Sequence, residues 1–539
     1  MEINKILKPL GAIVTIVALA WFILGYRLFP AINLRNLPFY IFLVVIVGVL
    51  LTTNKPDYVK FIPPTIILII LIVFTTSSTF TRAKNYVTIS DMEEKQKPEE
   101  RLKSIKKDEI PTIDRETADR IGNRAMGTIP ELAGIYQSPE YFTTIIYKDR
   151  LTRVAPLEYS GIFSWFKNNN KGIPAYITVD MATGKYELVR LKEPMKYSAQ
   201  EYFKRDIMNM LRRKYITKLW FNPSFELDDK GHPYWVVPER INTIGVFGEV
   251  VGDIYIVDAI NGKIKTYNKD KVPEWVDRVY QTNTYLSYVR DKGMLSNGAL
   301  NSIMAKTGTY KPTSSYESED EDSEYDDDGF SYIELKDENG KPRVYTYTGI
   351  TSGADNDKSN MGFVLMNNRT GKVEKYTNAM VEEYSAMTSA QGSVQEKGYK
   401  ATFPTLLVNK GNFIYFMNLK DQAGLTKGYA IVDADDYQKV YIGNSVVDVF
   451  NKLEGNKEIK QDKTTEEKTP TKTTKITVNE LYTQVKDGNT EYIIISNNKT
   501  YVLSTKDDHK YKGIKIKKDD TLEVEYEEKE YFNQIKDLK

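Results

Sequence analysis

The chain has 539 residues, a formal net charge of +1 and no cysteine. That length exceeds one compact domain, so two or more domains are expected. The absence of cysteine excludes disulfides, thiolate catalysis and zinc sites with cysteine ligands. The 74 Lys and Arg nearly balance the 73 Asp and Glu, so no overall field favours a nucleic acid or another polyanion as partner.

The first 84 residues predict an anchor of three transmembrane helices. Uncharged apolar runs extend over residues 9–26, 36–54 and 61–81. A helix needs about 20 such residues to cross a bilayer core of roughly 30 Å. The alternative for the first run is a signal peptide, but two further runs follow and no cleavage site is evident. We therefore expect a multi-pass cell-membrane protein of a bacterium or a bacterial virus.

Residues 85–110 follow the third run and carry charges of both signs, which predicts a charged stalk. Lys and Arg flank both ends of the predicted spans in similar numbers, so the positive-inside rule does not decide the topology. The charges lean weakly towards a cytoplasmic large domain, so the opposite side is inferred from the family resemblance described below and from the absence of nucleotide and cofactor motifs.

A hairpin pattern recurs four times within residues 111–455. The copies cover residues 175–189, 253–267, 362–376 and 428–442, and each predicts a strand, a polar turn and a second strand. The turns begin at Asp180, Asp258, Asn367 and Asp433, whose side chains can bond the turn backbone. Gly184, Gly262 and Gly371 then supply a positive φ, whereas the fourth copy carries Tyr437 at that position.

A second hairpin precedes each copy, at residues 225–238, 332–347 and 405–419, with a less regular counterpart near 141–159. Segments with helical apolar spacing separate these units. The expected fold class is therefore α+β, with three N-terminal transmembrane helices, repeated units of a helix and antiparallel hairpins, and a small C-terminal β-barrel. An acidic insertion at residues 317–328 is expected to be disordered, with loose calcium binding as the alternative.

The repeated unit resembles the PepSY family, small domains of helix and antiparallel sheet with a final hairpin of the form VD..TGK. The first copy matches it with Val179, Asp180, Thr183, Gly184 and Lys185, and the second with Val257, Asp258, Gly262 and Lys263. The resemblance implies non-catalytic work outside the cytoplasmic membrane, such as peptidase inhibition, chaperoning or envelope regulation. It therefore places the large domain on the extracytoplasmic side.

Two further segments complete the chain. Residues 456–474 are rich in Lys, Glu, Thr and Pro and predict a linker. Residues 475–539 predict five strands, at 475–484, 491–496, 500–504, 513–517 and 521–527, whose spacing resembles an OB-fold barrel. Many OB-folds bind nucleic acid. Here Glu523, Glu525 and Glu527 crowd the last strand and oppose a phosphate backbone, so a protein or structural role is favoured.

No catalytic, cofactor-binding or metal site is predicted. The only histidines, His232 and His509, lie in turn-like contexts. A P-loop and a nucleophile elbow are absent. Residues 104–107 and 306–308 match parts of the penicillin-binding motifs, and residues 355–359 begin like an EF-hand loop, but the other required positions are missing.

The leading functional hypothesis is a non-enzymatic binding or scaffold protein that faces the cell envelope, with the membrane and other envelope proteins as partners. The alternative from another class is a membrane-tethered hydrolase whose carboxylates follow no sequence motif, and a third is a virus-encoded membrane protein that acts on the host envelope. A cleft that gathers buried carboxylates with perturbed pKa values would favour the hydrolase.

Overall fold

The structure is a computed structural model of the full chain. It describes residues 30–43, 62–103, 105–127, 129–139, 141–313, 329–354, 359–455, 472–486, 489–497, 499–504, 516–528 and 533–538. The chain divides into two compact units, Met1–Gly455 and Asn456–Lys539. It is a mixed α/β structure in which strand, at 39%, predominates over helix, at 25%.

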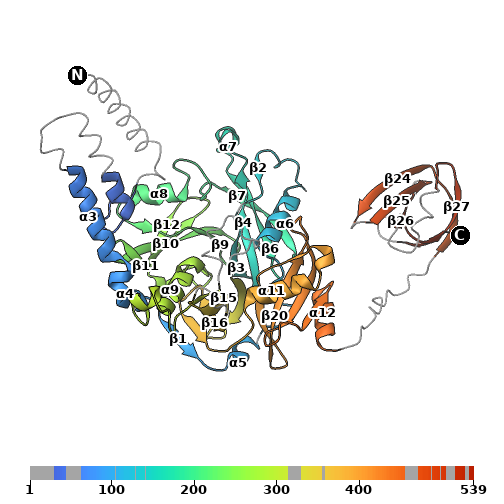
Figure 1. Cartoon of the computed structure of the whole chain (residues 1–539). Helices are drawn as coiled ribbons and strands as arrows, with labels where there is room; N and C mark the ends of the chain where they lie inside the picture. Colours follow the sequence, from blue (N-terminus) through green and yellow to red (C-terminus); the bar gives the residue numbers. More distant parts are fainter. Residues whose placement is uncertain are drawn as a thin grey trace, which may run out of the picture. The chain divides into compact units, whose positions relative to one another are not determined.

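Four antiparallel sheets of the first unit share one plan, in which four successive strands form a meander (Figure 1). Sheet 1 contains β3 (Thr143–Tyr147), β4 (Arg150–Pro156), β6 (Ile173–Asp180) and β7 (Tyr186–Met195). Sheet 2 contains β9 (Ser224–Leu227), β10 (Pro233–Ile244), β11 (Phe247–Asp258) and β12 (Ile264–Tyr267). Sheet 3 contains β14 (Ser331–Lys336), β15 (Pro342–Ser352), β16 (Asn360–Asn367) and β17 (Val373–Tyr376). Sheet 4 contains β19 (Thr405–Asn409), β20 (Asn412–Lys420), β21 (Thr426–Asp433) and β22 (Val440–Gly443).

Short strands extend these sheets. The second strand of sheets 2, 3 and 4 also pairs with β8 (Leu219–Trp220), β13 (Tyr310–Pro312) and β18 (Lys400–Ala401), respectively. A separate pair is formed by β2 (Tyr136–Gln137) and β5 (Glu158–Tyr159). In the segment predicted as a charged stalk, β1 (Met92–Lys95) runs parallel to β17 and so belongs to sheet 3.

The last turn of sheets 1, 2 and 3 is built in the same way. Asp180 Oδ1 accepts from the backbone N–H groups of Ala182 and Thr183, at 3.0 and 2.8 Å. The corresponding carboxylate of Asp258 and amide of Asn367 make the same pair of bonds. The glycines that follow have φ of 69°, 75° and 81°, which confirms the predicted positive φ at Gly184, Gly262 and Gly371.

Sheet 4 has a longer last turn. Asp433 again accepts from two backbone N–H groups, but its own N–H bonds the carbonyl of Lys439, six positions on. In sheet 1 the N–H of Asp180 bonds the carbonyl of Lys185, five positions on. The extra residue explains why this copy dispenses with the glycine of the other three.

Helices cover both faces of the sheets. Their bounds are α5 (Pro98–Leu102), α6 (Arg115–Gly127), α7 (Ile162–Asn168), α8 (Ile207–Lys214), α9 (Thr282–Leu295), α10 (Ala299–Ile303), α11 (Glu383–Gly392) and α12 (Val446–Leu453). Sheets 1 and 2 share one core with α8, through Ile207 and Leu211, and sheets 3 and 4 share another with α11, through Met387. Helices α9 and α12 pack on the other faces of sheets 3 and 4. Because a strand such as β16 is buried on both faces, its sequence is nearly continuously apolar.

The first strands of the meanders meet in the middle of the unit. Strand β3 packs against β9 and β15, and β4 packs against β9 and β14. Each of β3, β9 and β14 is bonded to only one neighbour within its sheet. Their free edges carry backbone groups that need partners from elsewhere in the fold.

The predicted fold class, an α+β chain with three transmembrane helices, is wrong. Within the described part of the chain, no single helix has the length and apolar composition needed to cross a membrane. Over the third predicted span, α3 (Ile62–Ser77) ends at Ser77, and the chain bends by 40° into α4 (Thr79–Val87). The first predicted span and residues 44–54 of the second lie outside the described residues. The predicted multi-pass cell-membrane localisation loses its basis with this correction.

A cluster of hydroxyl side chains explains the break. Thr75, Thr76 and Ser77 donate to carbonyls of the preceding turn of α3, an arrangement that bends helices. Ser78 then caps α4 by accepting from the N–H of Thr81. Ser77 also accepts from the N–H of Val246, so the end of α3 is attached to sheet 2.

The second unit contains six strands. They are β23 (Lys472–Thr477), β24 (Glu480–Lys486), β25 (Asn489–Ser496), β26 (Lys499–Ser504), β27 (Thr521–Glu528) and β28 (Asn533–Leu538), in the order β23-β27-β28-β26-β25-β24. The strand predicted at 475–484 is divided, because Val478 bonds Asp520 while Asn479 bonds Ile495. Residues 513–515 lie outside the described residues, and β28 was not predicted. The expected five-stranded, OB-fold-like module is corrected to this six-stranded sheet.

The glycine positions generate a graded prediction. Gly371→Ala should lower the free energy of unfolding by roughly 3 kcal/mol, because a Cβ would strain a positive φ and meet the Tyr285 hydroxyl. Gly411→Ala should cost about 1 kcal/mol, because its φ is 89° but nothing lies within 4 Å. Gly127→Ala, at a helical position with open space, is the control and should not destabilise. Urea unfolding followed by circular dichroism measures all three, and equal losses would contradict the account.

Candidate functional site

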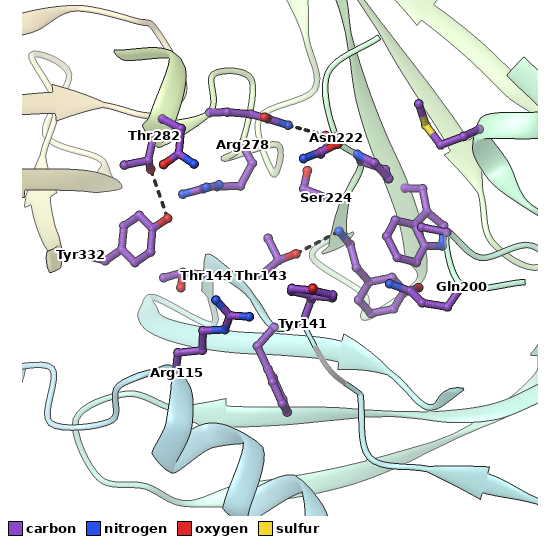
Figure 2. A pocket seen from close by; sticks show the side chains of 18 of the residues that line it. Arg115, Tyr141, Thr143, Thr144, Gln200, Asn222, Ser224, Arg278, Thr282 and Tyr332 are labelled. Carbon is purple, nitrogen blue, oxygen red and sulfur yellow. Dashed lines mark hydrogen bonds between the residues drawn. The ribbon is translucent and has the colours of Figure 1, made fainter. Parts of the chain in front are cut away.

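A cavity of about 730 Å³ lies where sheets 1, 2 and 3 meet (Figure 2). The beginnings of β3, β9 and β14 contribute to its wall, together with α8 and the N-terminal ends of α6 and α9. The central free strand edges therefore adjoin this space. Cavities of this size accommodate small molecules.

Every charged side chain in the wall is an arginine. Arg115 is the first residue of α6, Arg212 lies on α8, and Arg278 lies just before α9. Among the residues that the structure describes, the lining contains no Asp, Glu, Lys or His. None of the three arginines forms an ion pair with a residue in the described part of the chain. Asp119 lies within electrostatic reach of Arg115, and the buried Glu226 and Asp277 lie within reach of Arg278, so carboxylates behind the wall balance its positive charge only in part.

Two of these arginines lie against aromatic rings of the same wall. The guanidinium carbon of Arg115 is 5.1 Å from the centre of the Tyr141 ring, and that of Arg278 is 4.9 Å from the centre of the Tyr332 ring. Figure 2 shows the side chains of Arg115 and Arg278 entering the cavity from opposite sides. Stacking orients each guanidinium while leaving its N–H donors available.

The third arginine lies in a less favourable environment. Arg212 donates from Nη1 to the carbonyl of Lys218, at 2.8 Å. Burial, with a smaller contribution from nearby Arg240, lowers the pKa of Arg212. Burying the charge of Arg212 without a counterion costs free energy of folding, and a bound anion would offset that cost.

Several polar atoms of the lining side chains lack partners. Trp235 Nε1, Thr144 Oγ1 and Asn209 Oδ1 are buried and make no hydrogen bond. Asn209 donates from Nδ2 to the carbonyl of Phe203, at 3.1 Å, which fixes the orientation of its amide. Buried polar groups without a protein partner are rare in proteins and require a partner such as water or a ligand.

The N-terminus of α9 also adjoins the cavity. Gln281 is the N-cap residue, but its side chain does not cap the helix and instead donates to the carbonyl of Asn222, at 2.5 Å. The next two residues, Thr282 and Asn283, line the cavity. A helix N-terminus leaves several N–H groups free and carries partial positive charge. It therefore adds to the field of the arginines.

Two carboxylates are buried behind the wall without lining it. Glu226, on β9, accepts from the backbone N–H groups of Asp277 and Arg278, at 2.8 and 3.2 Å. Asp277 accepts from the N–H of Ile146, on β3, at 2.6 Å. Burial raises the pKa of both groups, and the proximity of Glu226 raises that of Asp277 further. These contacts place the backbone of Arg278.

The sequence predicted no site residue, and the structure places the weighed alternatives away from the cavity. His232 lies in the turn before β10, 3.1 Å from Asp258. His509, Ser104 and residues 355–358 lie outside the described residues. Among the residues that the structure describes, no group of three or more His, Asp and Glu could hold a metal ion. The arginines come from positions 115, 212 and 278, which no local motif connects.

Comparisons with known proteins add no identity. No known family and no characterised protein matches the sequence. The Synechocystis apocarotenoid oxygenase is 8% identical, over 56% of this chain and 50% of its own, with a TM-score of 0.13. A B. megaterium levansucrase is 9% identical, over 80% of this chain and 97% of its own, with a TM-score of 0.17. The polysaccharide lyase Uly1 is 10% identical, over 82% of this chain and 77% of its own, with a TM-score of 0.14.

The chain thus spans about half the length of the oxygenase. TM-scores this low establish no shared fold. The resemblances to PepSY and to the OB-fold likewise gain no support from these comparisons. The cavity itself is the remaining basis for a functional argument.

The buried carboxylates predict a pH dependence of stability. Because the folded state raises the pKa of Asp277, its contribution to stability falls as the pH rises above the ordinary carboxyl range of about 4 and through the raised pKa. Asp277→Asn should therefore unfold with a free energy that declines less than that of the wild type between pH 5 and 8. Asp229→Asn, at an exposed position, is the control. Urea titrations in which both variants respond to pH alike would contradict this prediction.

Proposed function

We propose that the protein is a non-enzymatic binding protein whose ligand is an anion held in the cavity between sheets 1, 2 and 3. The observation that carries the proposal is the presence of three arginines in a wall without any acidic side chain. The unpartnered polar atoms and the uncapped start of α9 support it independently. A fixed set of donors around a desolvated cavity favours anions over neutral ligands.

The composition of the wall argues against the rival hydrolase. General acid–base catalysis needs a group that titrates near neutral pH, within hydrogen-bond reach of the substrate. The lining offers arginine, amide, hydroxyl and aromatic side chains, and none of these serves that role readily except tyrosine. The two carboxylates with raised pKa that bond the segment of Arg278, Glu226 and Asp277, are 0% and 2% exposed and bond backbone groups.

Phosphate binding to an arginine variant tests the proposal. Arg278→Gln removes the guanidinium and should weaken the binding of inorganic phosphate by about tenfold or more, the usual worth of a charge-assisted hydrogen bond. The thermal unfolding midpoint of the full chain, measured against phosphate concentration, reports this affinity.

Arg124→Gln is the matched control, because Arg124 is exposed on α6 and does not line the cavity. It should respond to phosphate like the wild type. Equal responses of the two variants would place phosphate binding elsewhere and contradict the proposal. An unfolding midpoint that phosphate does not move in the wild type would contradict it as well.

A further inference from the structure

We infer that the ligand of this cavity is a hydroxylated anion of the saccharide class, a sugar acid or a sugar phosphate, rather than a bare inorganic ion. The inference rests on the proposed function and specifies its ligand. It follows from three features of the wall, each of which requires a different part of such a molecule.

The first feature is a corner in which positive groups converge. Arg278 and Thr282 both contact Tyr332, the guanidinium over the ring and the Thr282 hydroxyl 3.1 Å from the phenol oxygen. Figure 2 shows these three side chains together on one side of the cavity. Thr282 is the first residue of α9, so the helix N-terminus and the guanidinium face the same corner. A carboxylate or phosphate group fits there.

The second feature is the mixture of unpartnered donors and acceptors. Trp235 Nε1 can only donate a hydrogen bond, whereas Asn209 Oδ1 can only accept one. A fully ionised oxyanion has no hydrogen to give to the Asn209 oxygen. A ligand hydroxyl group both donates and accepts, so it suits a wall that holds both kinds of atom.

The third feature is an open aromatic surface. The Tyr141 side chain lines the cavity and is 60% exposed, and Arg115 lies over its ring. Exposed aromatic faces are suited to packing against flat, partly apolar groups such as the C–H face of a sugar ring. A cavity of about 730 Å³ also has room for more than a single ion.

Four compounds distinguish these contributions in isothermal titration calorimetry with the full chain. Glucuronate and glucose 6-phosphate should each bind at least about tenfold more tightly than inorganic phosphate or glucose, because only they combine a charge with the hydroxyls of a sugar ring. A difference between glucuronate and glucose 6-phosphate would tell whether the corner prefers a carboxylate or a phosphate.

A tryptophan pair then tests the hydroxyl contacts. Trp235→Phe keeps an aromatic ring but removes the unpartnered donor, so it should weaken glucose 6-phosphate about fivefold to tenfold and leave inorganic phosphate unchanged. Trp220 also carries an Nε1 without a partner, yet it does not line the cavity. Trp220→Phe is therefore the matched control and should bind both compounds like the wild type.

The outcomes separate the two proposals. If inorganic phosphate binds as tightly as glucose 6-phosphate, and Arg278→Gln weakens both, the saccharide inference is overturned while anion binding stands. If glucose binds as tightly as glucose 6-phosphate, or if no anion binds, both proposals are overturned. If Trp235→Phe and Trp220→Phe behave alike, the hydroxyl contacts assigned here are wrong.

Discussion

Two buried carboxylates hold the centre of the first unit together. Glu226, on the free edge strand of sheet 2, binds the backbone N–H groups of Asp277 and Arg278, in the segment that leads to sheet 3. Asp277 in turn binds the N–H of Ile146, on the free edge strand of sheet 1. Three sheets that share no strand are thereby joined through side-chain acceptors for backbone donors that would otherwise be buried without partners. Replacing either group by an apolar side chain would leave these donors without their acceptors.

This arrangement determines the character of the cavity. The two carboxylates accept hydrogen bonds from backbone N–H groups and do not line the cavity. Arg278, which follows Asp277 in the chain, does line it. Arg115 and Arg212 reach that space from helices of other parts of the unit. The result is a wall whose described lining carries three arginines and no acidic side chain, so a bound anion would stabilise it. Binding proteins commonly hold strain of this kind at the site where the ligand relieves it.

The local parts of this structure could be predicted from the sequence, and the long-range parts could not. Each turn glycine lies within six residues of the Asp or Asn that bonds its turn. The alternation of apolar and polar residues and the residue types of the turn therefore predicted these hairpins. Over the third predicted span, hydropathy does not register how Thr75, Thr76 and Ser77 bond to the backbone where α3 ends. The cavity was missed because its arginines are far apart in the chain and have no spacing that marks an anion site. The tyrosine rings beside Arg115 and Arg278 are visible only in three dimensions.

The central claim is that the cavity between sheets 1, 2 and 3 binds an anion through Arg278, Arg115 and Arg212. Crystals of the full chain soaked in selenate, an analogue of sulfate with a strong anomalous signal, test it most directly. The account predicts an anomalous peak within hydrogen-bond distance of the Arg278 guanidinium and near the first turn of α9. Selenate peaks confined to lysines and arginines outside the cavity would contradict it.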